Sequence, residues 1–204
     1  MYRPDYENAR REAGFRWHVG SSQAALREVT GIPIEQFNLD PDACIEAYRR
    51  GQPILDELFG DAVGPVPIAT PAVSYGHVNG LGSELIFPEG GEVAHTHIYT
   101  SLEEGIQALR QPVDFATAGM APFFLDFWEK MRAAFPGREV GFSYGLEGPI
   151  TTAWELRGEG FFTDIFDQPE RAQEFLGLVV DSILEFHRFR CSVSGTVGRL
   201  HLSG

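Results

Sequence analysis

The stretch VGFSYGLEGPITTAWELRGEGFFTDIFDQPERAQEF, residues 140–175, decides the fold that we expect for this chain. Its apolar start at 140–144 predicts a buried strand, and the glycines around it allow the backbone to turn tightly. Pro149 predicts the start of a helix, because the N–H that proline lacks would have no helical partner there. Asp167 and Glu170 form a capping-box pattern, which predicts that Asp167 caps a second, longer helix. A strand that passes through a Gly-rich turn into a helix is the unit of α/β folds, whose ligands bind at the carboxyl ends of the strands.

The remaining segments extend this unit into a pattern in which helices come first and strands then alternate with helices. Periodicity, capping and breaker residues predict helices at 21–30, 40–59, 101–109, 123–135 and 169–189, and strands at 66–72, 83–87 and 197–202. This order favours an α/β fold with a mostly parallel sheet. After the helical front, the chain has room for about half of the β/α units of an eight-stranded barrel. The sheet is therefore expected to be open, completed by another copy in a homo-oligomer, or completed by further chain.

The charge and composition of the chain exclude several classes of partner. Its 204 residues carry a formal net charge of −13, whereas nucleic acid and anionic membranes select basic surfaces. The polar N-terminal residues do not have the pattern of a signal peptide, and no apolar run reaches membrane-spanning length. Two cysteines without a CxxC motif favour a reduced compartment. We therefore expect a cytoplasmic protein that binds neither nucleic acid nor membranes.

Two parts of the sequence resemble the uroporphyrinogen decarboxylase superfamily. The run GLEGPITTAWELRGEGFFTDIFDQPERAQEFL, residues 145–176, has that family's Gly-Pro-apolar-Thr pattern, a helix that ends near a glycine, and a short turn into a long helix. The run YGHVNGLGSELIFPE, residues 75–89, followed by the capped helix SLEEGIQAL, residues 101–109, is similar to the family's first barrel unit. Together the resemblance covers residues 66–190.

The resemblance implies a (β/α)8 TIM-barrel type of α/β fold with a single deep cleft. This chain would supply only the N-terminal part of that barrel. We expect a helical N-terminal segment at 1–62 and the N-terminal portion of the barrel at 63–204.

The superfamily has two branches with different activities, and the sequence departs from both. One branch decarboxylates the acetate side chains of uroporphyrinogen without a cofactor, but here Val73 stands near its key Asp, and Glu155 near its Tyr. The segment 10–14 matches only part of its RQAGR signature. The other branch transfers methyl groups between corrinoid proteins, thiols and other acceptors, usually with zinc held by a His and two Cys. LHLSG at 200–204 resembles its HxCG zinc motif, with Ser203, a poorer zinc ligand, in place of the thiolate.

These departures favour the methyltransferase branch or an uncharacterised branch. One alternative is a uroporphyrinogen decarboxylase, a lyase of porphyrin biosynthesis that would need no cofactor. The other is a non-catalytic half-barrel that binds a tetrapyrrole or a partner protein. For methyl transfer, the resemblance implies zinc and a corrinoid presented by a partner protein. The partner would then be a small-molecule or corrinoid-protein substrate.

The candidate site residues lie in loops and at element ends, where barrel enzymes place their catalytic groups. We expect catalytic roles for Tyr144, Glu147 and His77, substrate-binding roles for Ser74, Tyr75 and Arg157, and metal binding by His201 and Cys191. In the cleft, Glu147 would act as an acid or base with a pKa raised by burial; otherwise it is a solvated loop carboxylate. His201 is alternatively a core histidine, and Cys191 a small buried hydrophobic side chain.

The pair His95 and His97 forms an HxH pattern upstream of Glu103. Two histidines at i and i+2 of an extended segment point to the same side, and with a carboxylate they form a pattern that binds iron or manganese. The pattern is similar to the first cupin motif, but its spacing to Glu103 is longer and no second motif follows. We therefore interpret it as a surface or loop feature, and we expect Glu155 to be an exposed helical residue.

Overall fold

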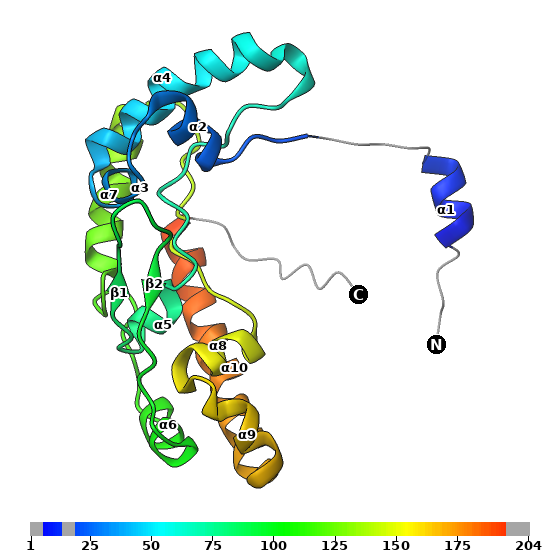
Figure 1. The fold of residues 1–204 in the computed structure, drawn as a ribbon, viewed down its shortest axis with the longest axis vertical. Coiled ribbons are helices and arrows are strands. Elements are labelled where there is room, and N and C mark those ends of the chain that lie inside the picture. The colour runs from blue at the N-terminus through cyan, green and yellow to red at the C-terminus, as the bar shows by residue number, and fades with distance from the viewer. Residues whose placement is uncertain (1–5, 14–18, 195–204) are drawn as a thin grey trace.

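The computed structural model describes residues 6–13 and 19–194, and this part of the chain is mostly helical (Figure 1). Its helices are α1 (Tyr6–Ala13), α2 (Gln23–Thr30), α3 (Ile34–Leu39), α4 (Pro41–Phe59), the 3-10 helix η1 (Gly60–Ala62), α5 (Gly76–Gly80), α6 (Leu102–Leu109), α7 (Ala121–Ala134), α8 (Pro149–Arg157), α9 (Gly160–Asp167) and α10 (Pro169–Ser194). The strands β1 (Leu85–Ile86) and β2 (Ala94–His95) form an antiparallel hairpin in which Leu85 pairs with His95.

The segments 66–72 and 140–144, both expected to be strands, are extended and lie parallel to each other. They meet in two isolated parallel bridges, Ala69 with Gly141 and Val73 with Tyr144. No regular ladder forms between these bridges, because a proline at position 71 supplies no N–H. The side chain of Thr70 instead accepts a hydrogen bond from the backbone N–H of Ser143, at 2.8 Å.

The expected mostly parallel sheet is therefore replaced, in the described residues, by two bridged segments and one short antiparallel hairpin. The predicted strand at 197–202 lies outside the described residues. A (β/α)8 barrel arrangement remains a prediction.

The free edge of the segment 66–72 is covered by side chains of the helical front. Gln23 donates from Nε2 to the carbonyl of Thr70 at 2.9 Å and accepts from the N–H of Ala72 at 2.9 Å. The Tyr48 hydroxyl bonds the carbonyl of Pro67 at 3.0 Å and lies 3.2 Å from the N–H of Ala69. These two side chains take the place that a neighbouring strand would have, so the backbone polar groups remain paired.

Most predicted helix boundaries agree with the structure. Ser101 caps α6 through a 3.2 Å bond from the N–H of Glu104, as the capping box predicts. The prediction for Asp167 was wrong, because Asp167 is the last residue of α9, and α10 begins two residues later at Pro169. The Pro-Glu pair alone is enough to open α10, since proline fits the first turn of a helix.

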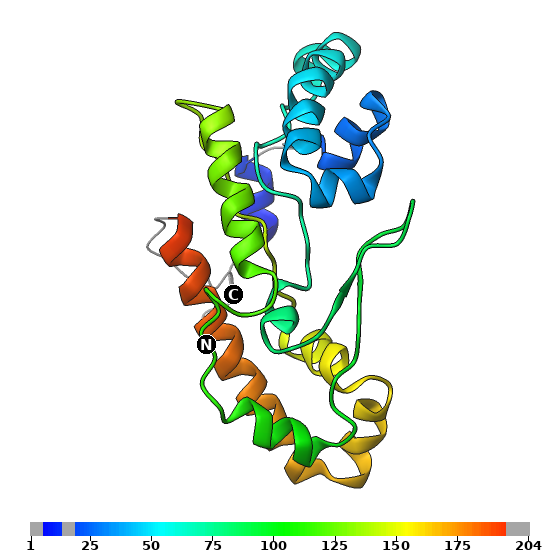
Figure 2. The same cartoon turned by 90° about the vertical axis from the view of Figure 1, so that its left-hand side faces the viewer.

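Three groups of buried apolar side chains hold the described part together, and Figures 1 and 2 show the elements that supply them. The first joins α2, α3 and α4 to α7, the second joins α6, α8 and α9 to α10, and the third lies between them around Tyr144 and Phe186. α7 contributes to the first and the third group. Apolar packing thus crosses the proposed boundary between residues 62 and 63, and that domain division remains a prediction.

Candidate functional site

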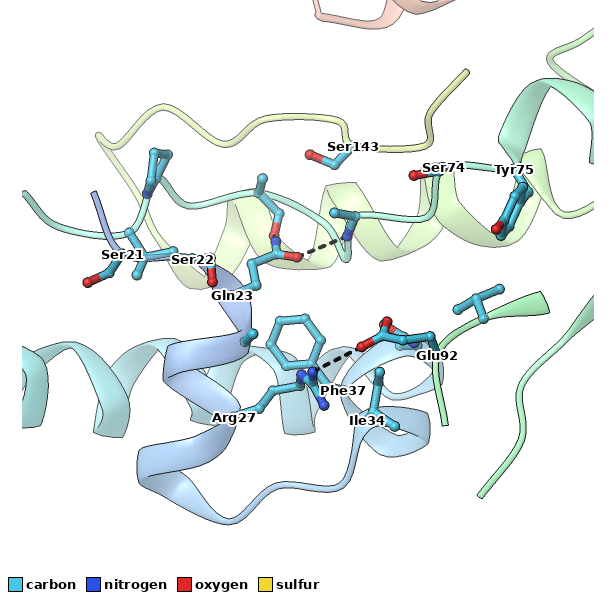
Figure 3. A pocket seen from close by; sticks show the side chains of 17 residues that line it. Ser21, Ser22, Gln23, Arg27, Ile34, Phe37, Ser74, Tyr75, Glu92 and Ser143 are labelled. Carbon is cyan, nitrogen blue, oxygen red and sulfur yellow. Dashed lines mark hydrogen bonds and ion pairs between the residues drawn. The ribbon is translucent and has the colours of Figure 1, made fainter. Parts of the chain in front are cut away.

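A cavity of about 490 Å³ lies between α2, α3 and the segment 66–75, and it reaches Ser74 and Tyr75 just after the bridge at Val73. Figure 3 shows Tyr75 and Ser74 at one end of this cavity and Ser21 at the other. Its lining combines hydroxyl, amide and apolar groups: Ser21, Ser22, Gln23, Ala24, Arg27, Ile34, Phe37, Asn38, Val66, Pro67, Ala69, Ala72, Ser74, Tyr75, Glu92, Val93 and Ser143. The volume falls in the range of small-molecule sites. The Tyr75 end of the cavity lies at the carboxyl end of the first parallel segment, where α/β folds bind their ligands.

The charged groups of the cavity wall are Arg27 and Glu92, which face each other across it. Their nearest atoms are 3.8 Å apart, and the dashed line in Figure 3 marks this pair. The Arg27 side chain is 21% exposed, whereas that of Glu92 is 86% exposed. A long ion pair with one solvated partner is weak, so Arg27 can exchange Glu92 for a ligand at little cost.

A cluster of aromatic rings adjoins the cavity on the far side of Tyr75. The Tyr75 and His95 ring centroids are 4.4 Å apart, and His95 also lies 5.4 Å from His97 and 6.3 Å from Trp154. His97 is held by a 2.8 Å bond from its Nδ1 to the carbonyl of Glu155. The HxH segment is thus part of this cluster, although the His97 side chain itself is exposed.

Glu155 is almost completely buried, with 1% of its surface exposed, so the expectation that it is exposed was wrong. It lies on the inner face of α8, next to Ala153 and Leu156 of the buried core. Burial, and secondarily the charge of Glu147, raises the pKa of the Glu155 carboxyl to about 7. Burial and the charges of Glu155 and Glu147 also raise the pKa of Tyr75. These three groups therefore lie close enough to act on one another electrostatically.

Tyr144 and His77, two of the three predicted catalytic residues, lie in the hydrophobic core. Tyr144 has no exposed surface, and its hydroxyl bonds the Asn79 side-chain oxygen at 2.5 Å. His77, on α5, is 1% exposed, and its Nε2 lies 2.8 Å from the hydroxyl of Ser182. None of the three lines the cavity, and the third, half-buried Glu147, acts through its charge on the pKa values of Tyr75 and Glu155.

The predicted substrate-binding residues separate in the same way. Ser74 and Tyr75 line the cavity. Arg157 is engaged elsewhere, because its Nε donates to Asp164 at 2.9 Å in a largely buried ion pair. Its guanidinium also packs against Gly160, where an added Cβ would clash. Arg157 therefore has a structural partner that a substrate would have to displace.

Of the two predicted metal ligands, Cys191 lies within the described residues and His201 does not. Cys191, on α10, has its Sγ 3.5 Å from His187 Nε2. Within 6–13 and 19–194, no group of three or more His, Cys, Asp or Glu side chains is arranged to hold a metal ion. The described residues thus do not assemble the donor set that the zinc prediction requires.

The sequence analysis selected Ser74 and Tyr75, which line the cavity, and Glu147, which does not, and it set aside the HxH pair and Glu155. The buried face of α8 consists of positions 152, 153, 155 and 156. Two of these, Ala153 and Leu156, are apolar, and their spacing is the sequence signal that places Glu155 on the same buried face. Arg27 and Gln23 were missed because they come from the helical front, distant in sequence from the strand ends.

A scan against protein-family models and a search of curated proteins found no match. Among solved structures, the chain is similar to a methyltransferase from Methanosarcina mazei, with a TM-score of 0.59 and 18% sequence identity. The similarity covers 86% of this chain and 49% of the methyltransferase, so this chain spans about half the length of that protein. At this identity the comparison establishes a shared fold, and membership of the uroporphyrinogen decarboxylase superfamily remains a prediction.

Proposed function

We propose that this chain is part of a methyltransferase-like enzyme that binds a small molecule in the cavity beside Tyr75. The observation that carries the proposal is the cavity that Ser74 and Tyr75 line just after the parallel bridge at Val73, in a chain that shares the fold of a methyltransferase. The charges of Glu147 and Glu155 act on Tyr75 at this end of the cavity. Barrel enzymes place their reactive groups at this end of the fold.

In this proposal Glu155 handles a proton. Methyl transfer to a thiol or amine acceptor releases a proton, and a group with a pKa of about 7 is well suited to accept it at neutral pH. Tyr75 would orient the substrate, because it lines the cavity and is influenced by the charges of both acids. Ser74 and Ser143 would supply hydrogen bonds from the cavity wall.

Zinc and a corrinoid-protein partner remain proposals for this chain. The described residues offer His187 and Cys191 as a pair, which is short of a zinc site. We therefore assign no step to a metal. Among the described residues, no helix combines the length and apolar character that a membrane span requires.

Uroporphyrinogen decarboxylation fits these residues less well. Its substrate is a polyanion, which requires several cations around it. Arg27 is the cationic residue of the cavity lining, and Arg157 is paired with Asp164. Glu147 and Glu155 would repel carboxylates, and buried Val73 offers no polar group to pyrrole N–H groups.

The test is a methyl-transfer assay with the whole chain. Methylcobalamin and a small thiol are incubated with the protein, with and without added zinc, and the methylated thiol is measured by mass spectrometry. We expect thioether formation above the protein-free rate, and a reduction of at least tenfold in the Glu155→Gln variant. The Glu84→Gln variant, which removes an equal charge at an exposed position, serves as the control.

Three results separate the alternatives. An equal rate in the wild type and in Glu155→Gln contradicts the role of Glu155. No methylated thiol, together with conversion of uroporphyrinogen under anaerobic conditions, assigns the chain to decarboxylation. Neither reaction, together with saturable tetrapyrrole binding, assigns it to the non-catalytic alternative.

A further inference from the structure

The guanidinium of Arg27 lies in the cavity wall and makes no hydrogen bond to any residue in 6–13 or 19–194. The oxygen that it faces belongs to Glu92 and is 3.8 Å away, which is beyond hydrogen-bond length. The Arg27 side chain is 21% exposed, so most of it is shielded from water. A guanidinium carries five N–H donors, and the fold leaves all of them available at this position. Arg27 can therefore bind an anion that enters the cavity.

Asn38 on α3 is a second polar side chain of the cavity lining that the fold leaves unpaired. It is 7% exposed, and its side-chain amide forms no hydrogen bond with another described residue. An unpaired buried amide lowers the stability of the free protein, and a bound ligand would satisfy it. Gln23, in contrast, already bonds the backbone of Thr70 and Ala72. Arg27 and Asn38 thus offer donors that the fold itself does not use.

The start of α2 adds to the positive character of the cavity. Its first residues, Ser22, Gln23 and Ala24, belong to the lining, and the Ser22 side chain forms no capping hydrogen bond. The first turn contains no acidic residue. Because the N-terminal end of a helix carries a partial positive charge, it adds to the attraction that Arg27 exerts on an anion.

The lining favours one class of anion, a single carboxylate on an apolar body. The guanidinium fork matches the two oxygens of a carboxylate, which it binds through two parallel hydrogen bonds. A phosphate monoester carries close to two negative charges at neutral pH. Arg27 is the cation of the lining, and Glu92 already places one negative charge beside it. Much of the remaining wall is apolar: Ile34, Phe37, Val66, Pro67, Ala69, Ala72 and Val93.

We propose that the cavity binds a small monocarboxylate, whose carboxylate group displaces Glu92 from Arg27 and accepts a further hydrogen bond from the Asn38 amide. The inference deepens the proposed function, because it rests on the same cavity and names the class of molecule bound there. Tyr75 lies away from Arg27 in Figure 3, so the apolar body extends toward Tyr75. The carboxylate itself thus stays apart from the end of the cavity where acidic side chains act on Tyr75.

The experiment compares three carboxylates with their neutral amides, using the whole chain. Benzoate, cyclohexanecarboxylate and hexanoate share the carboxylate and differ in the shape of the apolar body. Isothermal titration calorimetry measures each affinity at pH 7.5. We expect at least one carboxylate to bind, and to bind about tenfold or more tightly than its amide. Inorganic phosphate, measured in parallel, should bind more weakly than that carboxylate.

Two variants of the ion pair should have opposite effects on the affinity for that carboxylate. Arg27→Gln should weaken binding about tenfold or more, because it removes the charged donor. Glu92→Gln should strengthen binding about threefold, because this side chain no longer competes for the guanidinium. Arg50→Gln removes an equal charge from an exposed pair with Glu46 on α4 and should leave the affinity unchanged. An ion pair that only supports the fold would not change affinity in opposite directions.

Asn38→Leu separates binding from folding. Leucine has the same branched shape as asparagine and leaves no buried amide unpaired, so the free variant should unfold at a higher temperature than the wild type. Its affinity for the carboxylate should fall about threefold or more, because the amide donor is lost. An unchanged affinity, or a lower unfolding temperature, would contradict the place of Asn38 in the site.

The outcomes separate this proposal from the proposed function. No binding of any of the three carboxylates, equal affinity for acid and amide, tighter binding of phosphate, or equal affinities of Arg27→Gln and Arg50→Gln would overturn the carboxylate site. Carboxylate binding without methyl transfer would retain the site and contradict the proposed function. Methyl transfer without carboxylate binding would do the reverse.

Discussion

Glu155 and His77 are buried side chains whose pKa values move in opposite directions. Burial and Glu147 raise the pKa of Glu155 from 4.5 to about 7, and burial lowers the pKa of His77 from 6.5 to about 4. Each group therefore resists its charged form in the folded state. As the pH rises from about 4 to 7, the contribution of Glu155 to the free energy of unfolding falls while that of His77 increases. The two changes largely cancel in the wild type, so each is seen by comparing the wild type with a variant in which that group does not titrate.

Glu155→Gln should reveal the first effect. Because the pKa is raised on folding, the stabilising contribution of Glu155 is present below pH 4.5 and is lost as the pH rises through 7. Glutamine does not titrate, so the variant should gain stability relative to the wild type by about 2–3 kcal/mol between pH 5 and pH 8. Urea unfolding at both pH values measures this difference. If the stability difference between the variant and the wild type is the same at pH 5 and pH 8, folding does not change the pKa of Glu155 and this assignment is wrong.

His77→Gln should reveal the second effect. The His77 pKa is lowered on folding, so its contribution to stability is present above pH 6.5 and is lost as the pH falls through about 4. Glutamine can still bond Ser182 but takes up no proton. The wild type should therefore lose about 2 kcal/mol more than the variant between pH 7.5 and pH 5. If lowering the pH from 7.5 to 5 shifts the urea midpoint equally in the wild type and in the variant, this assignment is contradicted.

At the scale of single residues, sequence reasoning selected Ser74 and Tyr75, which line the cavity, and it misjudged the burial of Glu155; the roles assigned to Ser74, Tyr75 and Glu147 remain predictions. These three residues follow strand ends, a position that a pattern of strand and turn residues reveals. The burial of Glu155 depends on α10 and α6 packing against α8, contacts between segments far apart in the chain. A charged residue on a short helix looks exposed until those partners are known.

At the scale of elements, two helical glycines offer a matched test of packing. A Cβ added to Gly105 on α6 would lie 2.5 Å from the ring of Phe175 on α10, whereas one added to Gly177 on α10 would meet nothing within 4 Å. Gly105→Ala should therefore destabilise the protein by about 1–3 kcal/mol. Gly177→Ala should stabilise it by about 0.5–1 kcal/mol, because alanine loses less backbone entropy on folding. Thermal unfolding measures both, and equal shifts would contradict the close approach of α6 and α10.

Gln23 offers a second test at this scale. Its side chain bonds the backbone of Thr70 and Ala72 at the edge of the extended segment. Gln23→Ala should cost about 1–3 kcal/mol, since it leaves partly buried backbone groups unpaired. Gln107→Ala removes a bond between exposed side chains and should cost less than about 0.5 kcal/mol. Urea unfolding compares the two, and similar costs would mean that water replaces Gln23 at this edge.

Helices were easier to predict than strands in this chain. Ser101, Gly31 and Pro149 mark helix ends through local chemistry, and the structure agrees with them. The segment 66–72 has the apolar composition of a strand, yet regular pairing depends on a neighbour and on N–H groups at each position. Pro71 removes one such group, and Gln23 and Tyr48 occupy the other edge.

At the scale of the whole molecule, the order of elements predicted an α/β chain, whereas the described residues are mostly helical with one two-stranded sheet. The chain shares its fold with a methyltransferase of which it spans about half. The arrangement of the helical front could not be predicted in the same way. Its contacts with α7 and with the cavity join residues about 45–90 positions apart, such as Cys44 with Met131 and Gln23 with Ala69. No local pattern encodes such pairings.

α7 is the element that should make the described part unfold as one unit. Its Phe124 packs in the group around Tyr144 and Phe186, and its Phe127 and Met131 pack in the group formed with α2 and α4. Phe124 and Phe127 also stack with centroids 6.3 Å apart, so a change in one group reaches the other through α7.

Phe124→Ala tests this coupling. The substitution opens a cavity in the middle group and should cost about 3–5 kcal/mol. If α7 couples the groups, hydrogen exchange measured by mass spectrometry should accelerate both in α4 and in α10, although Phe124 belongs to neither helix. The exposed Lys130→Ala variant on the same helix should change neither region. Faster exchange confined to α7 and α10 would mean that the helical front is a separate cooperative unit, which would favour the division at residue 62.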